Sequence, residues 1–304
     1  MDAAESRQAR RAGASMRKFA AFLLLVACKT AAAAGETDAA LADVAADSAV
    51  DVAAVDVAAE VSASGWQATL TTSSKVPLQY SQGIARLPGG WAFSAKSGLW
   101  RTDDAFTELV AVVPPLPATL ADAEGYGHVG DIDYADGKLF AALEQGDSNV
   151  GKQAVAWFDP KTLEYQGHVY LPQHENPCLC IDEQTLIAYT PDRYHGDSVQ
   201  MYDVKANWKP LGTLKFSRKL DAMQGIDVQN GALWFSCDDP VHGLYRVDLK
   251  TGMVTQIGTI GRLEESGLQP EVEGIDAADG LLRTLTDNPL NATSWVDEWK
   301  VTGP

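Results

Sequence analysis

A short phrase of apolar and polar residues recurs five times along the chain, and each occurrence is marked by an isoleucine. The five isoleucines are Ile84, Ile132, Ile181, Ile226 and Ile275. They are separated by 48, 49, 45 and 49 residues. A fixed period of this length indicates a repeat architecture, in which each repeat is one supersecondary unit that stacks on its neighbours.

The hydrophobic pattern inside each repeat predicts four antiparallel strands. In the fourth repeat the apolar segment 224–228 leads to Asn230-Gly231, a dipeptide that supplies the positive φ angles of a two-residue hairpin turn. Three further strand-like segments follow, at 232–236, 244–249 and 253–257. Four short strands in a repeat of this length are typical of one blade of a β-propeller.

The fifth repeat is one strand short, because the chain nearly ends after the segment 292–299. A lone strand-like segment, 66–72, precedes the first repeat. Pairing this segment with the last blade would cover two exposed sheet edges at once. We therefore predict an all-β fold, a single β-propeller over 66–304 with five four-stranded blades, closed by the N-terminal strand. The alternative is six blades, with a degenerate blade within 112–127.

The first 27 residues predict a signal peptide rather than a part of the fold. A basic start, Met16-Arg17-Lys18, precedes the apolar run 19–27, which is too short to remain as a membrane-spanning helix. Met16 is therefore the expected natural start. The run ends in Leu25-Val26-Ala27-Cys28, which resembles the bacterial lipobox, whose cysteine is acylated. This resemblance implies an exported lipoprotein, and Lys29 favours the outer membrane; a secretory signal with a chance cysteine is the alternative.

Residues 28–65 predict an acylated Cys28 followed by a disordered tether. The segment consists mainly of Ala, Asp, Val and Ser and has no aromatic residue. Such a composition cannot build a hydrophobic core. We therefore expect the protein to contact the membrane through its lipid anchor only.

The formal net charge of −17 limits the partners of the chain. An acidic domain does not bind nucleic acid or anionic lipid by general electrostatics. Its charge suits metal cations and cationic ligands. The alternative is a solvated acidic surface that keeps the protein soluble.

If Cys28 is acylated, three cysteines are left, Cys178, Cys180 and Cys237. An exported protein is in an oxidising compartment, where cysteines can form disulfides. Their spacing lacks the second pair of a zinc site. Two arrangements stay open, one disulfide between the third and fourth repeats or three buried free thiols.

Residues just before the recurrent isoleucines are expected to line the central tunnel, because the inner strands of all blades converge on the axis. The residues that we predict to bind a ligand there are Gln82, His128, Asp131, Asn176, Gln224 and Glu273. Carboxylate and amide oxygens suit Ca²⁺. We predict Glu273 and Asp131 as its ligands; the alternative is that the ring only satisfies backbone groups of the tunnel.

The segment Glu273-Gly274-Ile275-Asp276 is similar to the Glu-Gly opening of lactonase-type propellers, the gluconolactonases and paraoxonases. In gluconolactonases the residue before such a glycine is a metal ligand, so the resemblance implies this role for Glu273. The matching positions hold Gln82 and Gln224 where those enzymes have Asn or Asp, and those enzymes have six blades. The Gln-Gly-Ile segments also resemble the five-bladed plant-type glutaminyl cyclotransferases.

Two functions are expected. The first is an envelope-anchored lipoprotein that presents the propeller to a small-molecule or protein ligand, with a central Ca²⁺ site. The second is a metal-dependent hydrolase of the lactonase or esterase type, in which the metal polarises the carbonyl group and His128 acts as the base. The sequence has no Gly-x-Ser-x-Gly elbow, phosphate loop or zinc helix.

Overall fold

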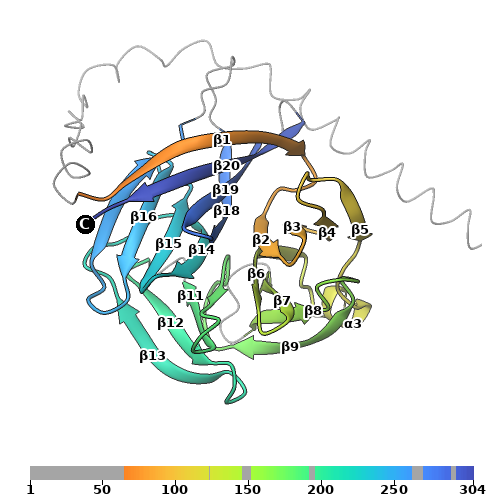
Figure 1. Ribbon diagram of the computed structural model, residues 1–304. Helices are drawn as coiled ribbons and strands as arrows, with labels where there is room; N and C mark the ends of the chain where they lie inside the picture. The colour runs from red at the N-terminus through yellow and green to blue at the C-terminus, as the bar shows by residue number, and fades with distance from the viewer. Residues whose placement is uncertain (1–64, 123, 146–151, 192–195, 262–269, 289–291) are drawn as a thin grey trace, which may run out of the picture. The chain divides into compact units, whose positions relative to one another are not determined.

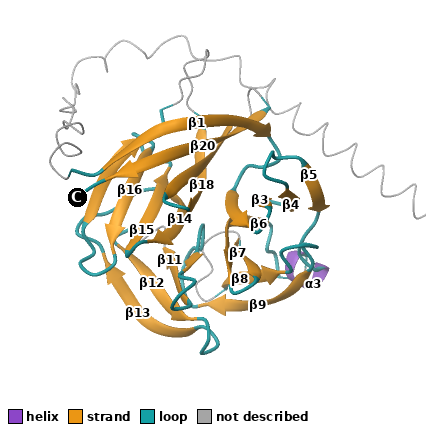
Figure 2. Ribbon diagram, viewed as in Figure 1, coloured by secondary structure: helices purple, strands orange, loops and turns teal. Residues whose placement is uncertain are grey.

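The computed structural model describes residues 65–304 apart from 123, 146–151, 192–195, 262–269 and 289–291. The predicted signal peptide, Cys28 and residues 28–64 of the predicted tether lie outside the described residues. β-Strands make up nearly all of the regular structure of the described part (Figure 2).

The strands form five four-stranded antiparallel sheets around a common axis, so the predicted five-bladed propeller is confirmed (Figure 1). Blade one holds β2 (Gly83–Leu87), β3 (Gly90–Ala95), β4 (Gly98–Thr102) and β5 (Glu108–Val112). Blade two holds β6 (His128–Ala135), β7 (Lys138–Glu144), β8 (Gln153–Phe158) and β9 (Tyr165–Leu171). Blade three holds β10 (Cys180–Ile181), β11 (Ile187–Pro191), β12 (Ser198–Asp203) and β13 (Lys209–Lys215). Blade four holds β14 (Met223–Gln229), β15 (Ala232–Cys237), β16 (Gly243–Asp248) and β17 (Val254–Thr259).

Blade five combines the two ends of the described chain. It holds β18 (Glu271–Ala278), β19 (Leu281–Asn288) and β20 (Thr293–Thr302), and its outermost strand is β1 (Gln67–Pro77). β1 runs antiparallel to β20, from Gln67 opposite Thr302 to Pro77 opposite Thr293 (Figure 1). The predicted closure by an N-terminal strand is therefore confirmed, and the strand extends five residues beyond the predicted 66–72.

The alternative of a sixth blade within 112–127 is wrong. Between β5 and β6 the described residues form loops and the short helix α3 (Ala118–Ala121). Pro114, Pro115 and Pro117 lie in this segment, and proline has no N–H to donate to a strand ladder. Within the described part of the chain, no helix is long and apolar enough to cross a membrane.

The predicted hairpin turns between the two innermost strands of each blade are confirmed at three dipeptides. Asp136, Asn230 and Asp279 have φ angles of 48°, 54° and 56°, and the glycines after them are also positive. Asn and Asp tolerate this left-handed region better than other non-glycine residues do. The turns therefore bring β6, β14 and β18 back along the axis as β7, β15 and β19.

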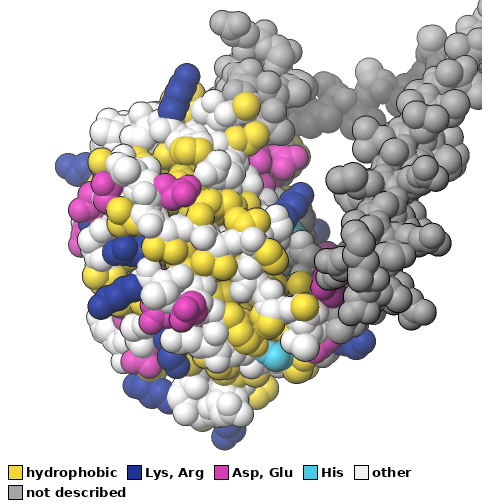
Figure 3. Space-filling model, turned by 90° about the vertical axis from the view of Figure 1, so that its right-hand side faces the viewer, with side chains coloured by type: hydrophobic (Ala, Val, Ile, Leu, Met, Phe, Trp, Pro, Cys, Tyr) yellow, Lys and Arg dark blue, Asp and Glu magenta, His cyan; other side chains and the backbone are white. Residues whose placement is uncertain are grey.

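The apolar core is divided among the blade interfaces. One buried cluster lies between each pair of neighbouring blades, for example Leu99 and Phe158 between blades one and two, or Val76 and Phe93 between blades five and one. Every blade packs on two neighbours. Removing the outer strand of a blade therefore exposes apolar residues at the interfaces with both neighbouring blades. On the side of the ring shown in Figure 3, acidic and basic side chains are interspersed with apolar ones.

Candidate functional site at the two ends of the propeller axis

The inner strands bulge where they pass the axis. The register between the first two strands shifts between Val129 and Ile132 in blade two, between Met223 and Gly225 in blade four, and between Val272 and Ile275 in blade five. A bulge leaves extra residues unpaired and re-aims their side chains. The extra residues are Gly130-Asp131, Gln224 and Glu273-Gly274, so half of the predicted ligand-binding residues, Asp131, Gln224 and Glu273, are bulge residues.

Asp131 is enclosed at the axis and bonds to backbone from other blades. Its Oδ2 accepts a hydrogen bond from the amide of Ile226 in blade four at 3.1 Å. Burial raises the pKa of Asp131 well above its usual value, while the amides of Ile226, Ile132 and Ile84 lower it. The side chain thus joins the inner strands of blades one, two and four.

Gly274 is required by this packing. A Cβ atom at position 274 would lie 2.6 Å from Oδ1 of Asp131 and 2.7 Å from Cα of Gly83. No side chain fits there, because the strands of blades one, two and five approach too closely. The glycine of the Glu-Gly segment is therefore explained by close approach at the axis.

Gln82, His128 and Glu144 form a chain of contacts at the end of the axis where the inner strands begin, which we call the strand-start end. Nε2 of Gln82 donates to the carbonyl of Ser81 at 2.6 Å, which turns its Oε1 towards Nε2 of His128. Nδ1 of His128 lies 3.0 Å from Oε2 of Glu144, the residue opposite it across β6 and β7. Both ring nitrogens therefore face oxygen acceptors, and the two contacts form together only when both nitrogens carry a proton.

Asn176 and Gln224, the other predicted amides, lie apart from this chain. Nδ2 of Asn176 donates to the carbonyl of Ala154 at 2.7 Å, which links blade three to blade two. Gln224 is the half-buried bulge residue of β14. The structure thus brings Gln82 and His128 together, whereas Asp131 lies further along the strand of His128 and Asn176, Gln224 and Glu273 belong to blades three, four and five.

Glu273 belongs to a cluster of three carboxylates on blade five. Glu271, Glu273 and Asp287 each offer an oxygen atom, and these three atoms lie within 4.8 Å of one another. Burial raises the pKa of Glu273 well above its usual value, with Asp287 and Glu271 adding to the rise. Burial also raises the pKa of Asp287 to about 6, again with help from Glu271. Asp131, the second predicted metal ligand, is not one of the three.

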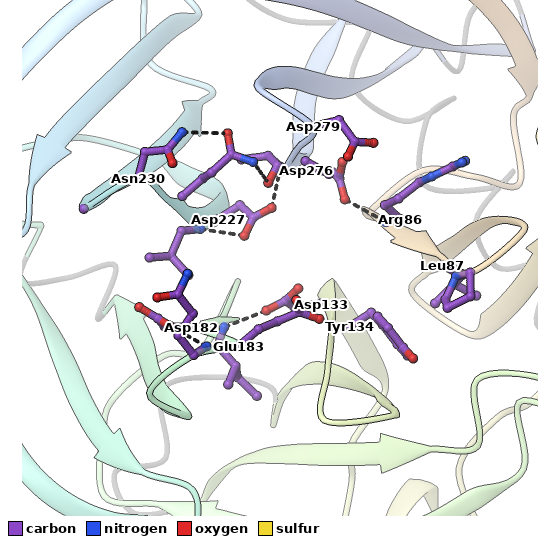
Figure 4. Close-up of a pocket in the computed structure, with 18 of the residues that line it drawn as sticks. Arg86, Leu87, Asp133, Tyr134, Asp182, Glu183, Asp227, Asn230, Asp276 and Asp279 are labelled. Carbon is purple, nitrogen blue, oxygen red and sulfur yellow. Dashed lines mark hydrogen bonds between the residues drawn. The ribbon is translucent and has the colours of Figure 1, made fainter.

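A pocket lies at the opposite end, where the hairpin turns of the inner strands gather. This turn-end pocket has a volume of about 730 Å³ and is lined by the first hairpin of every blade. Figure 4 shows Asp133, Asp227 and Asp276 pointing towards its centre from blades two, four and five. Asp182, Glu183 and Asp279 lie nearer its rim.

The three central aspartates of the turn-end pocket connect neighbouring blades. Oδ2 of Asp133 accepts from the amide of Ile181 in blade three at 2.6 Å. Asp227 accepts from the amide of Ala277 in blade five, and Oδ1 of Asp276 accepts from the amide of Arg86 in blade one at 2.7 Å. These carboxylates hold the ring together across three of its blade interfaces.

Burial and mutual repulsion shift the titration of these aspartates. Burial raises the pKa of Asp133 to about 7, against the effect of the Ile181 amide and with a contribution from Asp276. Burial raises the pKa of Asp276 to about 6, while Arg86 and Arg283 lower it. The pKa of Asp227 is raised by burial, then by Asp133 and Asp276. The pocket therefore contains acids that exchange protons near neutral pH.

Sequence reasoning missed these aspartates as site residues, although they were visible in the repeat. Each one directly follows a recurrent isoleucine, at Asp133, Asp227 and Asp276. The prediction used the residues before the isoleucine and not the residue after it. The recurrent Ile-Asp pair was the signal that could have identified them.

The three described cysteines are free thiols. Cys178, Cys180 and Cys237 are all buried, and none forms a disulfide. Burial raises the pKa of the Cys180 and Cys237 thiols well above their usual values, which keeps them protonated and unreactive. Of the two predicted arrangements, the structure shows the free thiols.

Comparison with known proteins shows the fold. No family model matches the chain, and no curated protein matches it. A glutaminyl cyclase from Myxococcus xanthus has a similar structure, with a TM-score of 0.59 and 11% identity over 79% of this chain and 98% of that chain. A luciferin-regenerating enzyme aligns with a TM-score of 0.47 and 11% identity over 73% and 79% of the two chains. An aldose sugar dehydrogenase from Streptomyces coelicolor, bound to PQQ, aligns with a TM-score of 0.46 and 12% identity over 78% and 98%. All three are named as enzymes, and at these identities the likeness concerns the fold alone.

Proposed function

We propose that this protein is a ligand-binding β-propeller whose turn-end pocket binds a small, positively charged ligand rich in hydrogen-bond donors. The observation that carries the proposal is the pocket of about 730 Å³ on the axis, to which all five blades contribute. A concave volume of this size is typical of small-molecule sites.

The lining of the turn-end pocket determines the chemistry of the ligand. Carboxylates, amide groups and backbone of the hairpins surround the space, and Arg86 is the one basic residue among its lining residues. Nη1 of Arg86 is already paired with Asp104 at 2.6 Å. The pocket thus offers mainly acceptors and negative charge, so a ligand with ammonium or hydroxyl donors complements it.

The central acids of the pocket are held in place before a ligand arrives. Asp133 and Asp276 have one oxygen fixed by a backbone amide of a neighbouring blade. The other oxygen of Asp133 contributes negative charge when the group is ionised, whereas Oδ2 of Asp276 is paired with Nη1 of Arg283 at 3.4 Å. A site that is ordered in advance loses less conformational entropy on binding.

Calorimetric titration with three four-carbon probes tests the proposal. Putrescine, butanediol and succinate share a spacer and differ in carrying two ammonium, two hydroxyl or two carboxylate groups. We expect putrescine to bind most tightly and succinate least. Glu183→Gln and Asp279→Asn, both exposed at the rim, should each weaken putrescine binding by about fivefold, or about 1 kcal/mol. Asp122→Asn, an exposed acid outside the pocket, is the matched control.

Equal affinity for putrescine and succinate would contradict the proposed charge complementarity. Equal weakening by Asp122→Asn and by the rim variants would show that binding depends on net charge and not on the pocket. Asn at position 279 preserves the positive φ of the hairpin turn, so a loss of folding is not expected from that variant.

A metal-dependent hydrolase of lactones or esters is the second candidate function. The observation that favours it is Glu273 at the strand-start end, a buried acid whose pKa is raised well above its usual value by burial and by the neighbouring Asp287 and Glu271. Against a role of His128 as the base, both nitrogens of its ring already face Gln82 and Glu144. Screening the protein against lactones and aryl esters, with and without chelator, tests this candidate; chelator-sensitive turnover that Glu273→Gln abolishes would support it.

We also propose that the propeller is exported and attached to the outer membrane through acylated Cys28, with the tether between them. The proposal is supported by the resemblance of Leu25-Val26-Ala27-Cys28 to a lipobox. In a bacterial host, Cys28→Ala should move the protein from the membrane fraction to the soluble fraction. An unchanged distribution would contradict lipidation at this residue.

A further inference from the structure

The carboxylate cluster of blade five is built by one strand pair. Glu271 on β18 lies opposite Asp287 on β19. The register shift that follows Val272 places Glu273 in the bulge, and its carboxylate joins the other two. The three donor atoms lie within 4.8 Å of one another.

Two of these three carboxylates are removed from water. Glu273 is 4% exposed and Asp287 is 9% exposed. Oδ1 of Asp287 is buried and has no hydrogen-bond partner within the described part of the chain. A buried polar atom without a partner destabilises a fold unless an ion, water or ligand satisfies it.

The surroundings add negative charge to the cluster. Asp238 of blade four raises the pKa of both Glu273 and Asp287, and Lys96 of blade one lowers it. Oδ1 of Asp238 accepts from the amide of Val272 at 3.2 Å and faces Nδ1 of His242 at 3.3 Å. Lys96 is exposed, so one solvated ammonium group faces four carboxylates.

We propose that Glu271, Glu273 and Asp287 form a binding site for a divalent metal ion, with Ca²⁺ as the best fit. All three donors are carboxylate oxygens, which suit hard cations. Oxygen atoms bound to one Ca²⁺ lie at most about 4.6–5.2 Å apart, twice the Ca–O distance, so the three donor atoms are close enough to share one ion. Ca²⁺ also tolerates irregular geometry, whereas Mg²⁺ demands a near-ideal octahedron. The exposed Glu271 gives the ion a route from solvent, and water molecules complete its coordination. This site is independent of the turn-end pocket and of its ligand.

Calcium titration of the metal-stripped protein tests the site. Calorimetry should show one Ca²⁺ per chain, and the melting temperature should rise with Ca²⁺ concentration, because an ion that binds only the folded state stabilises it. Asp287→Asn and Glu273→Gln, both isosteric, should each weaken Ca²⁺ binding by at least about tenfold. Asp122→Asn removes the same charge from an exposed site elsewhere and should bind Ca²⁺ as the wild type does.

The metal-free variants provide a second measurement that separates loss of the site from loss of the fold. Without Ca²⁺, Asp287→Asn and Glu273→Gln should melt at the same temperature as the wild type or above it, since each removes one of the repelling carboxylates. The absence of a calcium-induced rise in the wild type would overturn the proposal, as would an equal rise in Asp287→Asn. Binding of putrescine is measured separately. The proposed ligand of the turn-end pocket can therefore be disproved without affecting the proposed Ca²⁺ site, and the Ca²⁺ site can be disproved without affecting the pocket.

Discussion

The two ends of the propeller axis both carry carboxylates, but the carboxylates differ in what they bond. At the turn end, Asp133 and Asp276 each accept a hydrogen bond from a backbone amide of the next blade. At the strand-start end, Asp287 keeps a buried oxygen beside Glu273, and no residue that the structure describes bonds to it. A carboxylate that accepts from a backbone amide stabilises the fold, whereas a buried carboxylate oxygen without a partner is available to an ion, a water molecule or a ligand.

The ends also differ in the space that they offer. The turn end has a pocket large enough for an organic molecule and lined by five hairpins. The carboxylates of blade five instead come from a single strand pair, and their oxygen atoms are close enough together to contact one ion. Similar residue types thus favour an organic ligand at one end and a metal ion at the other, because geometry decides what fits between them.

The largest effect is expected from opening the ring on which both ends depend. A chain that begins at residue 78 lacks β1, the outermost strand of blade five, and exposes the edge of β20. Its melting temperature should fall by more than about 10 °C, or about 3–5 kcal/mol for a domain of this size. A chain that begins at residue 65 is the control, and thermal unfolding followed by circular dichroism is the measurement. If both truncations melt together, closure by β1 does not stabilise the ring.

A matched pair of alanine substitutions compares a carboxylate from each end directly. Asp276→Ala leaves the Arg86 amide without its acceptor and removes the ion pair between Asp276 and Arg283, so the free energy of unfolding should fall by about 2–3 kcal/mol. Asp287→Ala breaks no hydrogen bond between Oδ1 and the described residues and relieves repulsion, so in metal-free buffer it should change that free energy by less than about 0.5 kcal/mol. Urea unfolding of both variants measures the difference. Equal losses of unfolding free energy in the two variants would contradict the view that the turn-end carboxylate stabilises the fold and the strand-start carboxylate does not.

The smallest predicted effect concerns pH. Asp133 has a pKa raised to about 7 in the folded protein, so the folded state binds its proton more tightly than the unfolded chain does. The stability that this proton supplies is fully present below about pH 4 and is lost as the pH rises through about 7. The pKa values of Asp276 and Asp227, which face Asp133, are also raised, so their protons likewise stabilise the folded state at low pH.

Asp133→Asn tests this linkage, because an amide oxygen still accepts from Ile181 and does not titrate. Between pH 5.5 and pH 8 the wild-type melting temperature should fall by about 4–8 °C more than that of the variant, or about 2 kcal/mol. Melting curves in chelator exclude any effect of metal ions at the other end. If the two proteins show the same pH slope, Asp133 does not titrate in this range.

Much of the fold could be predicted because its causes are local and repeated. The period of the isoleucines reflects one buried inner strand per blade, and dipeptides such as Asn230-Gly231 require the hairpin turns that the structure shows. Closure followed from the count of strands, because the last repeat lacked one strand of a four-stranded blade and the segment before the first repeat could supply it. Gln82 and His128 were predicted at one end of the axis, and the structure places them in contact.

The composition of the candidate sites was less predictable, because it depends on register. Glu271 and Asp287 are sixteen positions apart and meet only because β18 and β19 pair with a shift before Ile275. Asp131 was predicted beside Glu273, yet its carboxylate faces the amide of Ile226. A bulge of one residue changes the face of the sheet to which the following side chains point. The hydrophobic pattern of the segment does not show where such a bulge lies.

The sequence by itself determined the five blades, the strand that closes them and the acidic character of the ring, since hydrophobic period, turn residues and charge are properties of short segments. Only the tertiary structure determined which group each acidic side chain bonds to. Asp133 and Asp182 both follow a recurrent isoleucine, but Asp133 bonds to the next blade, whereas Asp182 bonds to the amides of its own turn, at 2.8 Å for Gln184. The physical reason is that β10 ends at Ile181, one residue before Asp182, and the partner of a carboxylate is set by the blade that packs against it.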